Sequence, residues 1–336
     1  MNKIADFLNA NFVKKYLTKH LKHIYPQIKH ITELNIVPKK NFIWESTYHV
    51  VFLFDITYLD HDGSVGRLPI FCSAHSNESR KKYFHVLKYL WEHGFANSDI
   101  TIARPLFYSN YYKAIFYRGI SGESLLDYIK QGNRGEIEKV VAKVAKWLAK
   151  LHQLPLPPEN IINKGNNVIT TVIPGQKRVL KWMQERYDGE FYQPLKKCYL
   201  SIGGRERKFL KNTSQRWLVH GDAHADNVVE AGLDKIAMID FTDMAISDFA
   251  RDLGTFVWQM EYKIKRWMDD EIFAAKIKKI FLDNYCVAAG IVLDEGLQTR
   301  IDNYYNWIIL RTVVYLLTKH EPQPEKARQL LKTIEF

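Results

Sequence analysis

The spacing of apolar residues along the chain changes twice, and each change predicts a different kind of element. Residues 2–24 carry apolar side chains at helical spacing, which predicts one or two amphipathic helices packed onto a larger body. Beyond them the period shortens to that of strands, and five segments predict strands: 31–37, 47–59, 66–74, 100–109 and 111–120. The turn-rich sequence DHDGS between the second and third favours an antiparallel hairpin.

Helical spacing interrupts these strands once and then replaces them. Residues 79–95 predict a helix that ends near Gly94. After a turn signal at residues 121–123 the helical period dominates. Further helices are predicted at 135–152, at 179–187, near 206–210 and over most of 248–336. The exception is the segment 217–241, which predicts short apolar strands around polar loops.

Together these elements predict an α+β protein with two lobes. The N-terminal lobe is expected to be a small antiparallel sheet with one main helix, and the larger C-terminal lobe to be mostly helical. The expected limits are 1–30 for an N-terminal helical segment, 31–118 for the N-terminal lobe and 119–336 for the C-terminal lobe.

Composition and charge narrow the class of protein. No apolar run approaches the ~20 residues that cross a bilayer, and the N-terminus lacks the apolar stretch of a signal peptide, so a cytoplasmic protein with no membrane partner is expected. Cys72, Cys198 and Cys286 are widely spaced, which indicates core thiols and not a disulfide framework or a zinc site. The net charge of +11 is scattered over segments of helical spacing. It favours solvated helix faces over a nucleic-acid surface, but would attract nucleotides or an acidic substrate.

The segment LVHGDAHADNVV concentrates ionisable side chains between apolar strands. Burial of a carboxylate such as Asp222 beside apolar strands costs several kcal/mol unless the group is paired or binds a cation. An acid follows an apolar strand again at Asp240, thirteen residues after Asn227. Amide and carboxylate oxygens suit a hard cation such as Mg²⁺, which keeps waters and phosphates as its other ligands.

The order of these residues is that of a kinase catalytic loop: His-x-Asp, Asn five residues after the Asp, then Asp-Phe on a later strand. A hydroxyl that attacks a γ-phosphorus needs an acceptor for its proton, and Asp222 is the candidate. The phosphates need bridging cations, and Asn227 and Asp240 are the candidate ligands.

The sequence resembles the aminoglycoside phosphotransferase and choline kinase-like family through the pattern HGDxHxxN. The matching residues are His220, Gly221, Asp222, His224 and Asn227. The resemblance implies a protein-kinase-like fold and the transfer of the γ-phosphate of ATP to a hydroxyl of a small molecule. It implies that Asp222 is the catalytic acid–base residue, that Asn227 and Asp240 are magnesium ligands, and that ATP binds between the lobes.

Two further segments extend the resemblance. The stretch SDFARDL, residues 247–253, is similar to the family's segment after the second metal ligand, which implies that Asp252 braces the catalytic loop. The segment 114–125 resembles the family's hinge, so the backbone of Arg118 and Ile120 is expected at the adenine edge. Ser46, at the end of the expected phosphate loop, is a further nucleotide-binding candidate.

The chain departs from the family in its N-terminal lobe. No lysine stands on the third strand, where the family places one, and Tyr83 lies near the position of its glutamate partner. The phosphate loop 39–46 contains no glycine, so its backbone is less free to wrap a phosphate. The candidate substitutes for the lysine are Lys40, Arg67, Lys81 and Lys82. A catalytically weak or inactive nucleotide-binding relative therefore stays an alternative.

Structural interpretations remain open for several of these residues. Asn227 and Asp240 could instead form Asx turns. His220 and His224 are expected to support the loop and not to bind metal. Structural roles are also favoured for other residues that could reach the site: Asp243, Asp248, Tyr304, Tyr305 and Trp307.

Two other functional classes fit the sequence less well. A metallohydrolase is disfavoured because no histidine follows His224 until His320, which leaves too few ligands. A nucleic-acid binder is disfavoured by the scattered charge, and it would lose affinity steeply as salt is raised. The expected ligands are ATP with Mg²⁺ and a small hydroxylated substrate of unassigned identity.

Overall fold

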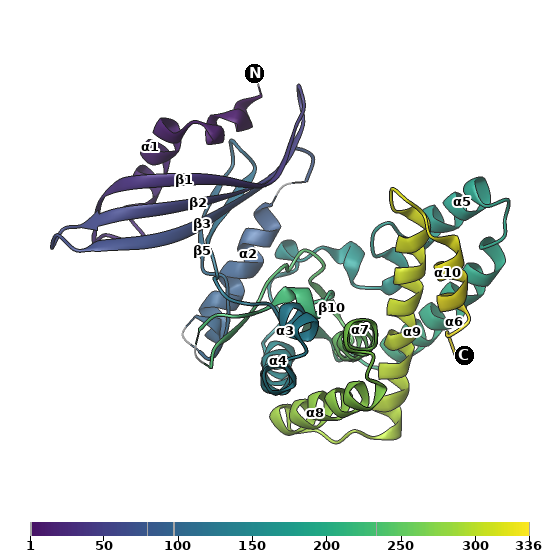
Figure 1. Ribbon diagram of the computed structural model, residues 1–336. Coiled ribbons are helices and arrows are strands. Elements are labelled where there is room, and N and C mark those ends of the chain that lie inside the picture. Colours follow the sequence, from purple (N-terminus) through teal and green to yellow (C-terminus); the bar gives the residue numbers. More distant parts are fainter. Residues whose placement is uncertain (1, 79, 97, 233, 336) are drawn as a thin grey trace. The chain divides into compact units, whose positions relative to one another are not determined.

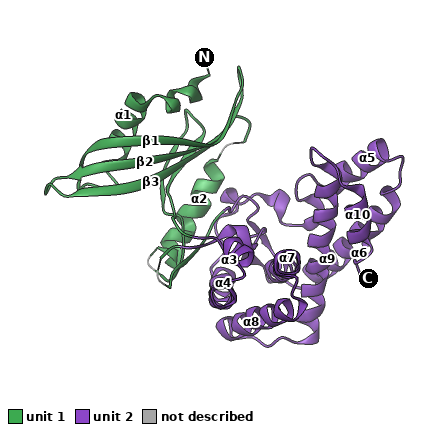
Figure 2. Ribbon diagram, viewed as in Figure 1, with its two compact units in different colours: residues 1–122, 231–239 green, residues 123–230, 240–336 purple. Residues whose placement is uncertain are grey.

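The computed structural model of the chain describes residues 2–78, 80–96, 98–232 and 234–335 (Figure 1). The chain forms two compact units, one of residues 1–122 with 231–239, the other of residues 123–230 with 240–336 (Figure 2). The first contains an antiparallel sheet and the second is mostly helical, so the predicted α+β class is confirmed. The domain limits expected from the sequence stay predictions.

A five-stranded antiparallel sheet forms the body of the first unit. Its strands, in the spatial order β1-β2-β3-β6-β5, are β1 (Ile28–Ile43), β2 (Tyr48–Asp60), β3 (Val65–His75), β6 (Ala114–Arg118) and β5 (Pro105–Ser109). The predicted hairpin is β2–β3, in which Asp55 pairs with Pro69. Its turn closes through a hydrogen bond from Asp60 N to Ser64 O at 2.8 Å, with Gly63 in a left-handed conformation.

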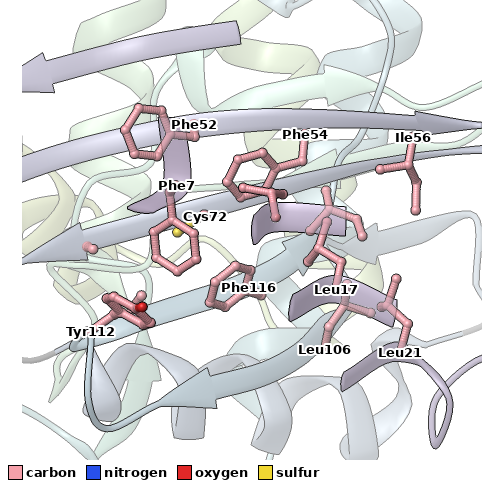
Figure 3. Close-up of a cluster of buried hydrophobic side chains, with 14 of the residues drawn as sticks. Phe7, Leu17, Leu21, Phe52, Phe54, Ile56, Cys72, Leu106, Tyr112 and Phe116 are labelled. Carbon is pink, nitrogen blue, oxygen red and sulfur yellow. The ribbon is translucent and has the colours of Figure 1, made fainter. Parts of the chain in front are cut away.

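The N-terminal segment covers one face of this sheet. It forms a 3-10 helix (Lys3–Leu8) and α1 (Ala10–Leu21), and Asn9 caps α1 by accepting a hydrogen bond from Phe12 N. Alternate residues of β2 point into the same core, as a half-buried strand requires. The ring centroid of Phe7 lies 5.9 Å from that of Phe54 and 5.6 Å from that of Phe116 (Figure 3). The predicted amphipathic N-terminal helices are therefore present and docked on the sheet.

The segment 100–109 is not one strand of the sheet, so that prediction is wrong. It divides into β4 (Ile100–Ile102) and β5, which belong to different sheets. β4 pairs in parallel with β9 (Ile236–Met238), and β5 starts at Pro105. Proline has no N–H to donate to a ladder, so it belongs at the start of a strand and not inside one.

The helix predicted before this segment is α2 (Lys81–Leu90), followed by a turn in which Gly94 has a φ of 99°. Ser79, where the predicted helix began, lies outside the described residues.

The second unit is built from helices. They are α3 (Leu125–Gln131), α4 (Arg134–Gln153), α5 (Gln176–Arg186), α6 (Tyr192–Asn212), α7 (Ala250–Met268), α8 (Glu271–Ala289), α9 (Glu295–Thr318) and α10 (Pro324–Leu331). Three short strands accompany them: β7 (Trp217–Val219), β8 (Val228–Glu230) and β10 (Ala245–Ser247). β7 pairs antiparallel with β10, so Val219 lies opposite Ala245. Asp248 accepts a hydrogen bond from Ala250 N at the start of α7, which agrees with its predicted structural role.

Helices α7 and α9 approach each other closely at Gly254. A Cβ atom at this position would lie 2.5 Å from the carbonyl oxygen of Ile301 and 2.7 Å from the nitrogen of Tyr305. Tyr304 and Trp307 are buried on the same helix, so the predicted core role of these two aromatic residues is confirmed. Only glycine lets the two backbones approach this closely.

The three cysteines lie wholly or partly inside the protein, as predicted. Cys72 and Cys198 are buried and Cys286 is partly buried, all as free thiols. Over the described ranges, every helix is too short or too polar to span a bilayer.

We expect Gly254→Ala to lower the free energy of unfolding by about 1–3 kcal/mol or more, because the added methyl group forces the two backbones apart. Gly204→Ala is the matched control within α6, since its Cβ would meet no described atom outside its own helix within 4 Å. That change should stabilise the protein by about 0.5–1 kcal/mol. Urea unfolding measures both, and equal effects of the two substitutions would contradict the assigned contact.

Candidate active site

The loop from His220 to Asn227 connects β7 to β8, and its first turn depends on Gly221. Gly221 has a φ of 83°, and a Cβ atom there would lie 2.2 Å from the carbonyl oxygen of Asp243. A side chain at this position would meet backbone and not a movable group, so glycine is required. A 3-10 turn (Ala225–Asn227) then returns the chain to β8.

The buried carboxylate of Asp252, in the first turn of α7, holds the start of this loop. Its Oδ2 accepts a hydrogen bond from His220 N at 2.6 Å, and its Oδ1 accepts one from Gly221 N at 2.8 Å. His152 of α4 approaches the same carboxylate through Nε2 at 3.1 Å, and its Nδ1 lies 2.8 Å from the hydroxyl of Tyr285. Burial raises the pKa of Asp252, but these bonds outweigh it and leave the pKa below its ordinary value.

A second charged group under the loop is Arg251, which is also fully buried. Its guanidinium donates to Asn166 O at 2.6 Å and to Gly221 O at 3.5 Å. Glu206 of α6 is buried close to this charge and accepts hydrogen bonds from Ile169 N at 3.0 Å and from the hydroxyl of Tyr304 at 3.3 Å. Burial raises the pKa of Glu206 to about 7, although Arg251 opposes the shift.

Asp222 presents its carboxylate from the middle of the loop, with 28% of the side chain exposed. Its Oδ1 accepts from Nη1 of Arg311 at 3.3 Å, and its Oδ2 lies 3.5 Å from Nε2 of His224. Burial by itself raises the pKa of Asp222, but the His224 hydrogen bond and the Arg311 charge hold it well below its usual range. Asp222 is therefore an ionised and partly accessible carboxylate at neutral pH.

The two loop histidines lie in different surroundings. His220 is fully buried, its ring contacts those of Trp147 and Phe241, and burial lowers its pKa. His224 is partly exposed. Its Nδ1 is 3.1 Å from Asp226 Oδ2, and its Nε2 is 3.1 Å from Asn227 Nδ2. Both rings contact neighbouring parts of the loop.

Asn227 and Asp240 offer oxygen atoms. Asn227 is buried, and its Nδ2 donates to the carbonyl oxygen of Asp222 at 3.0 Å. Within the described part of the chain, Oδ1 of Asn227 takes part in no hydrogen bond. Asp240 is exposed and has a φ of 60°, and its Oδ1 accepts from the hydroxyl of Thr242 at 2.7 Å.

Two cations that the sequence analysis did not single out also reach the loop. Arg311 of α9 bridges two carboxylates, because its Nη2 donates to Asp243 Oδ2 at 2.5 Å. Lys263 of α7 forms an ion pair with Asp226. Burial lowers the pKa of Lys263 to about 8, and Asp222 opposes this shift. The sequence gives only a weak sign of Arg311: it is a lone arginine in the apolar run IILRTVVYLL of a predicted helix.

The three predicted nucleotide-binding residues lie in the first unit. Arg118 and Ile120 line a cavity of about 460 Å³, together with Pro69, Arg104 and Lys235. The N–H of Arg118 donates to Arg104 O at 2.8 Å, so it is already used. No hydrogen bond among the described residues uses the N–H of Ile120. Ser46 is exposed in the turn between β1 and β2.

The first unit carries aromatic side chains on β3, where the family places a lysine, and near the turn between β1 and β2, where the family places a phosphate loop. Phe71 of β3 stacks on Tyr117 of β6, with ring centroids 5.6 Å apart and an angle of 8° between the planes. In the β1–β2 turn region, Phe42 stacks on Trp44 at 5.9 Å, and both rings are exposed. Neither feature supplies a phosphate ligand.

Comparison with protein families gave one match. The model of the phosphotransferase enzyme family matches residues 59–284, about two-thirds of the chain, and includes the loop and Asp240. A search of curated proteins found no match.

Solved structures share the fold. An aminoglycoside phosphotransferase, APH(2″)-IIa, in a ternary complex with streptomycin and ATP has a TM-score of 0.55 and 16% identity, covering 94% of this chain and 96% of that one. The ethanolamine kinase of Plasmodium vivax has a TM-score of 0.55 and 13% identity, covering 96% and 88%. Amicoumacin kinase in complex with AMP-PNP and Ca²⁺ has a TM-score of 0.52 and 14% identity, covering 99% and 93%. At these identities the likeness concerns the fold.

We expect Asp252→Asn to destabilise the protein by about 2–4 kcal/mol, because the amide replaces one acceptor with a donor that faces a buried N–H. Asp283→Asn is the control, since Asp283 forms an exposed ion pair with Lys279 on α8 and should change stability by less than about 0.5 kcal/mol. Chemical unfolding measures both. A stability of Asp252→Asn equal to that of the control would contradict the bracing role.

The stability effect of Glu206 should depend on pH. Because the folded-state pKa of about 7 lies above the ordinary value of 4.5, the folded protein holds the proton more tightly than the unfolded chain. Stability is therefore lost as pH rises from about 4.5 to about 7. Glu206→Gln removes this loss, so the variant should gain about 1–3 kcal/mol relative to the parent protein between about pH 5 and about pH 8.

The measurement is thermal or urea unfolding of both proteins across this range. Glu185→Gln, at an exposed position of α5, is the control and should show no such trend. A stability difference between parent and Glu206→Gln that does not vary with pH would contradict the assigned burial of the charge.

Proposed function

The chain belongs to the phosphotransferase enzyme family and is a small-molecule phosphotransferase, and we propose that it transfers the γ-phosphate of ATP to a hydroxyl group of its substrate. In this proposal the reaction depends on Mg²⁺, and Asp222 is the catalytic acid–base residue. The observation that carries the proposal is the state of Asp222: an ionised, partly exposed carboxylate on a loop whose backbone is fixed by Asp252.

The low pKa of Asp222 fits the demands of phosphoryl transfer. The transition state is loose, so the attacking hydroxyl loses its proton late and needs alignment more than a strong base. Oδ1 of Asp222 accepts a hydrogen bond from Arg311, while Oδ2 lies 3.5 Å from Nε2 of His224, and 28% of the side chain is exposed. We assign to this carboxylate the hydrogen bond that orients the acceptor hydroxyl and then takes its proton.

Asn227 and Asp240 are the proposed magnesium ligands, and their surroundings fit this ion. Because Asn227 donates through Nδ2 to the Asp222 carbonyl, its Oδ1 remains for a cation. No group of three or more His, Cys, Asp or Glu residues in the described chain could hold a metal by itself. Two hard oxygen ligands completed by water and phosphate oxygens are what Mg²⁺ uses in such enzymes. When bound, the ion would neutralise charge on the phosphates.

The first unit is proposed to contribute the nucleotide contacts. The N–H of Ile120 is the candidate donor to the adenine edge, since the neighbouring N–H groups of Arg118 and Gly119 already donate to Arg104 and Pro69. The Arg118 carbonyl is the candidate acceptor, and Ser46 a candidate phosphate contact.

A catalytically weak or inactive nucleotide-binding protein is the second candidate. It is favoured by the stacked Phe71 and Tyr117 on β3 and β6 and by the turn between β1 and β2, which has no glycine. Turnover by the parent protein separates the two: magnesium-dependent ADP release with a hydroxylated substrate supports the enzyme, and ATP binding without turnover supports the alternative.

We expect Asp222→Asn to lower kcat about 10²–10⁴-fold while ATP affinity changes little, because the amide keeps the shape but cannot accept the proton. Coupled detection of ADP measures kcat, and calorimetry measures ATP binding. Asp283→Asn on α8 serves as the control that should retain full activity. Retention of parental kcat by Asp222→Asn would contradict the assigned role.

A further inference from the structure

Asp222 has a cation at hydrogen-bonding distance on α9. The guanidinium of Arg311 donates one bond to Asp222 and one to Asp243. An arginine has five N–H groups in a planar fork, and 27% of this side chain is exposed, so donors remain for a ligand beside the catalytic carboxylate. Arg311 lies beyond residue 284, where the family match ends, so it is a feature of this chain outside the matched region.

Lys263 places a further positive charge near the same loop. It forms an ion pair with Asp226 from α7, and it lies close enough to Asp222 for the two charges to interact electrostatically. The partly exposed carboxylate that is proposed to receive the acceptor hydroxyl thus has a cation near it on each of two helices. Each of these cations is also paired with a further acid, Arg311 with Asp243 and Lys263 with Asp226.

A neighbouring segment of the second unit carries an excess of positive charge. Residues 164–216, which include α5 and α6, contain twelve Lys and Arg against four Asp and Glu. This net charge of +8 is most of the +11 of the whole chain, and one of the four acids, Glu206, is buried. A field of this kind raises the local concentration of anions and disfavours cations.

Helix α6 packs directly against the helix that carries Arg311 (Figure 1). Asn303 of α9 donates to Ile202 O at 3.1 Å, and the ring of Tyr199 meets Trp307 at 6.1 Å in a T-shaped contact. Tyr199 also lies close enough to Arg311 for the two to interact electrostatically. The positive segment and the catalytic carboxylate therefore border the same region of the second unit.

We propose that the acceptor of this enzyme is a hydroxylated acid, whose carboxylate or phosphate ester is bound by Arg311 while its hydroxyl hydrogen-bonds to Asp222. The inference rests on the proposed function and deepens it. In the reaction the hydroxyl oxygen forms a bond to the γ-phosphorus, and the bond from that phosphorus to the β–γ bridging oxygen breaks. ADP leaves, and the hydroxyl proton passes to Asp222 and then to solvent. The charge-assisted bonds to Arg311 select the acid.

The test compares acceptors of matched size and different charge. One set is glycerol, glycerate, glycerol phosphate and aminopropanediol, and the second is glucose, glucuronate, glucose phosphate and glucosamine. We expect kcat/KM for ADP release to be at least about tenfold higher for the better acid than for its neutral parent, and lowest for the amine. The two acids in each set distinguish a carboxylate from a phosphate ester as the recognised group.

Arg311→Gln tests the residue. We expect this change to reduce the acid-to-neutral ratio of kcat/KM about tenfold. The ratio is the readout because Arg311 also contacts Asp222, and a loss of turnover common to both acceptors cancels in it. Arg311→Lys should retain part of the preference. Lys279→Gln, at an exposed position of α8, should leave the ratio unchanged.

Each outcome bears on the inference. Preference of the parent protein for a neutral or amine acceptor overturns it, and so does an acid-to-neutral ratio that Arg311→Gln leaves unchanged. If Arg311→Gln does not fold, the preference of the parent protein decides. If no acceptor raises turnover, a thermal shift with acids but not with their neutral parents supports it, and equal shifts overturn it. Magnesium-dependent ATP hydrolysis without acceptor reports separately whether the proposed function stands.

Discussion

The geometry of the catalytic loop depends on one buried carboxylate. Asp252 accepts hydrogen bonds from the backbone of His220 and Gly221, and it is itself paired with His152. A buried anion is costly unless donors surround it, and here those donors are the loop itself and a neighbouring helix. The buried charge of Asp252 and the conformation of the loop therefore depend on each other. The Asp252 carboxylate is stable in the interior only when the loop adopts the conformation that presents Asp222.

Much of this arrangement could be predicted from the sequence, because it follows from local patterns. Alternating apolar residues predicted β2 and β3, and the order of residues in His220–Asn227 identified the family, which is confirmed. The bracing contact of Asp252 was expected from the resemblance. The strand predicted at 100–109 was wrong because its alternation continues across Pro105, where the hydrogen-bonding partner changes from one sheet to another.

The remaining parts of the site depend on contacts between distant segments. Arg311 stands 89 residues after Asp222, and no local pattern indicates that α9 passes the catalytic loop. The net charge of +11 is interpreted in the sequence as solvated helix faces because the basic residues lie mostly on segments of helical spacing. Most of the excess belongs to residues 164–216, which can be counted in the sequence, but only the fold shows that α6 of this segment packs on α9.

Helix α7 carries both Asp252 and Lys263, and their separation has a mechanical consequence. Eleven residues correspond to about three helical turns, so the two side chains project from nearly the same side about 16 Å apart along the axis. Helix α7 thus contacts the catalytic loop twice, through Asp252 at His220 and through Lys263 at Asp226. Insertion of a single residue between these points would rotate one contact by about 100° relative to the other. The number of residues between Asp252 and Lys263 is therefore fixed by the two contacts with the catalytic loop, just as the residue types at those two positions are.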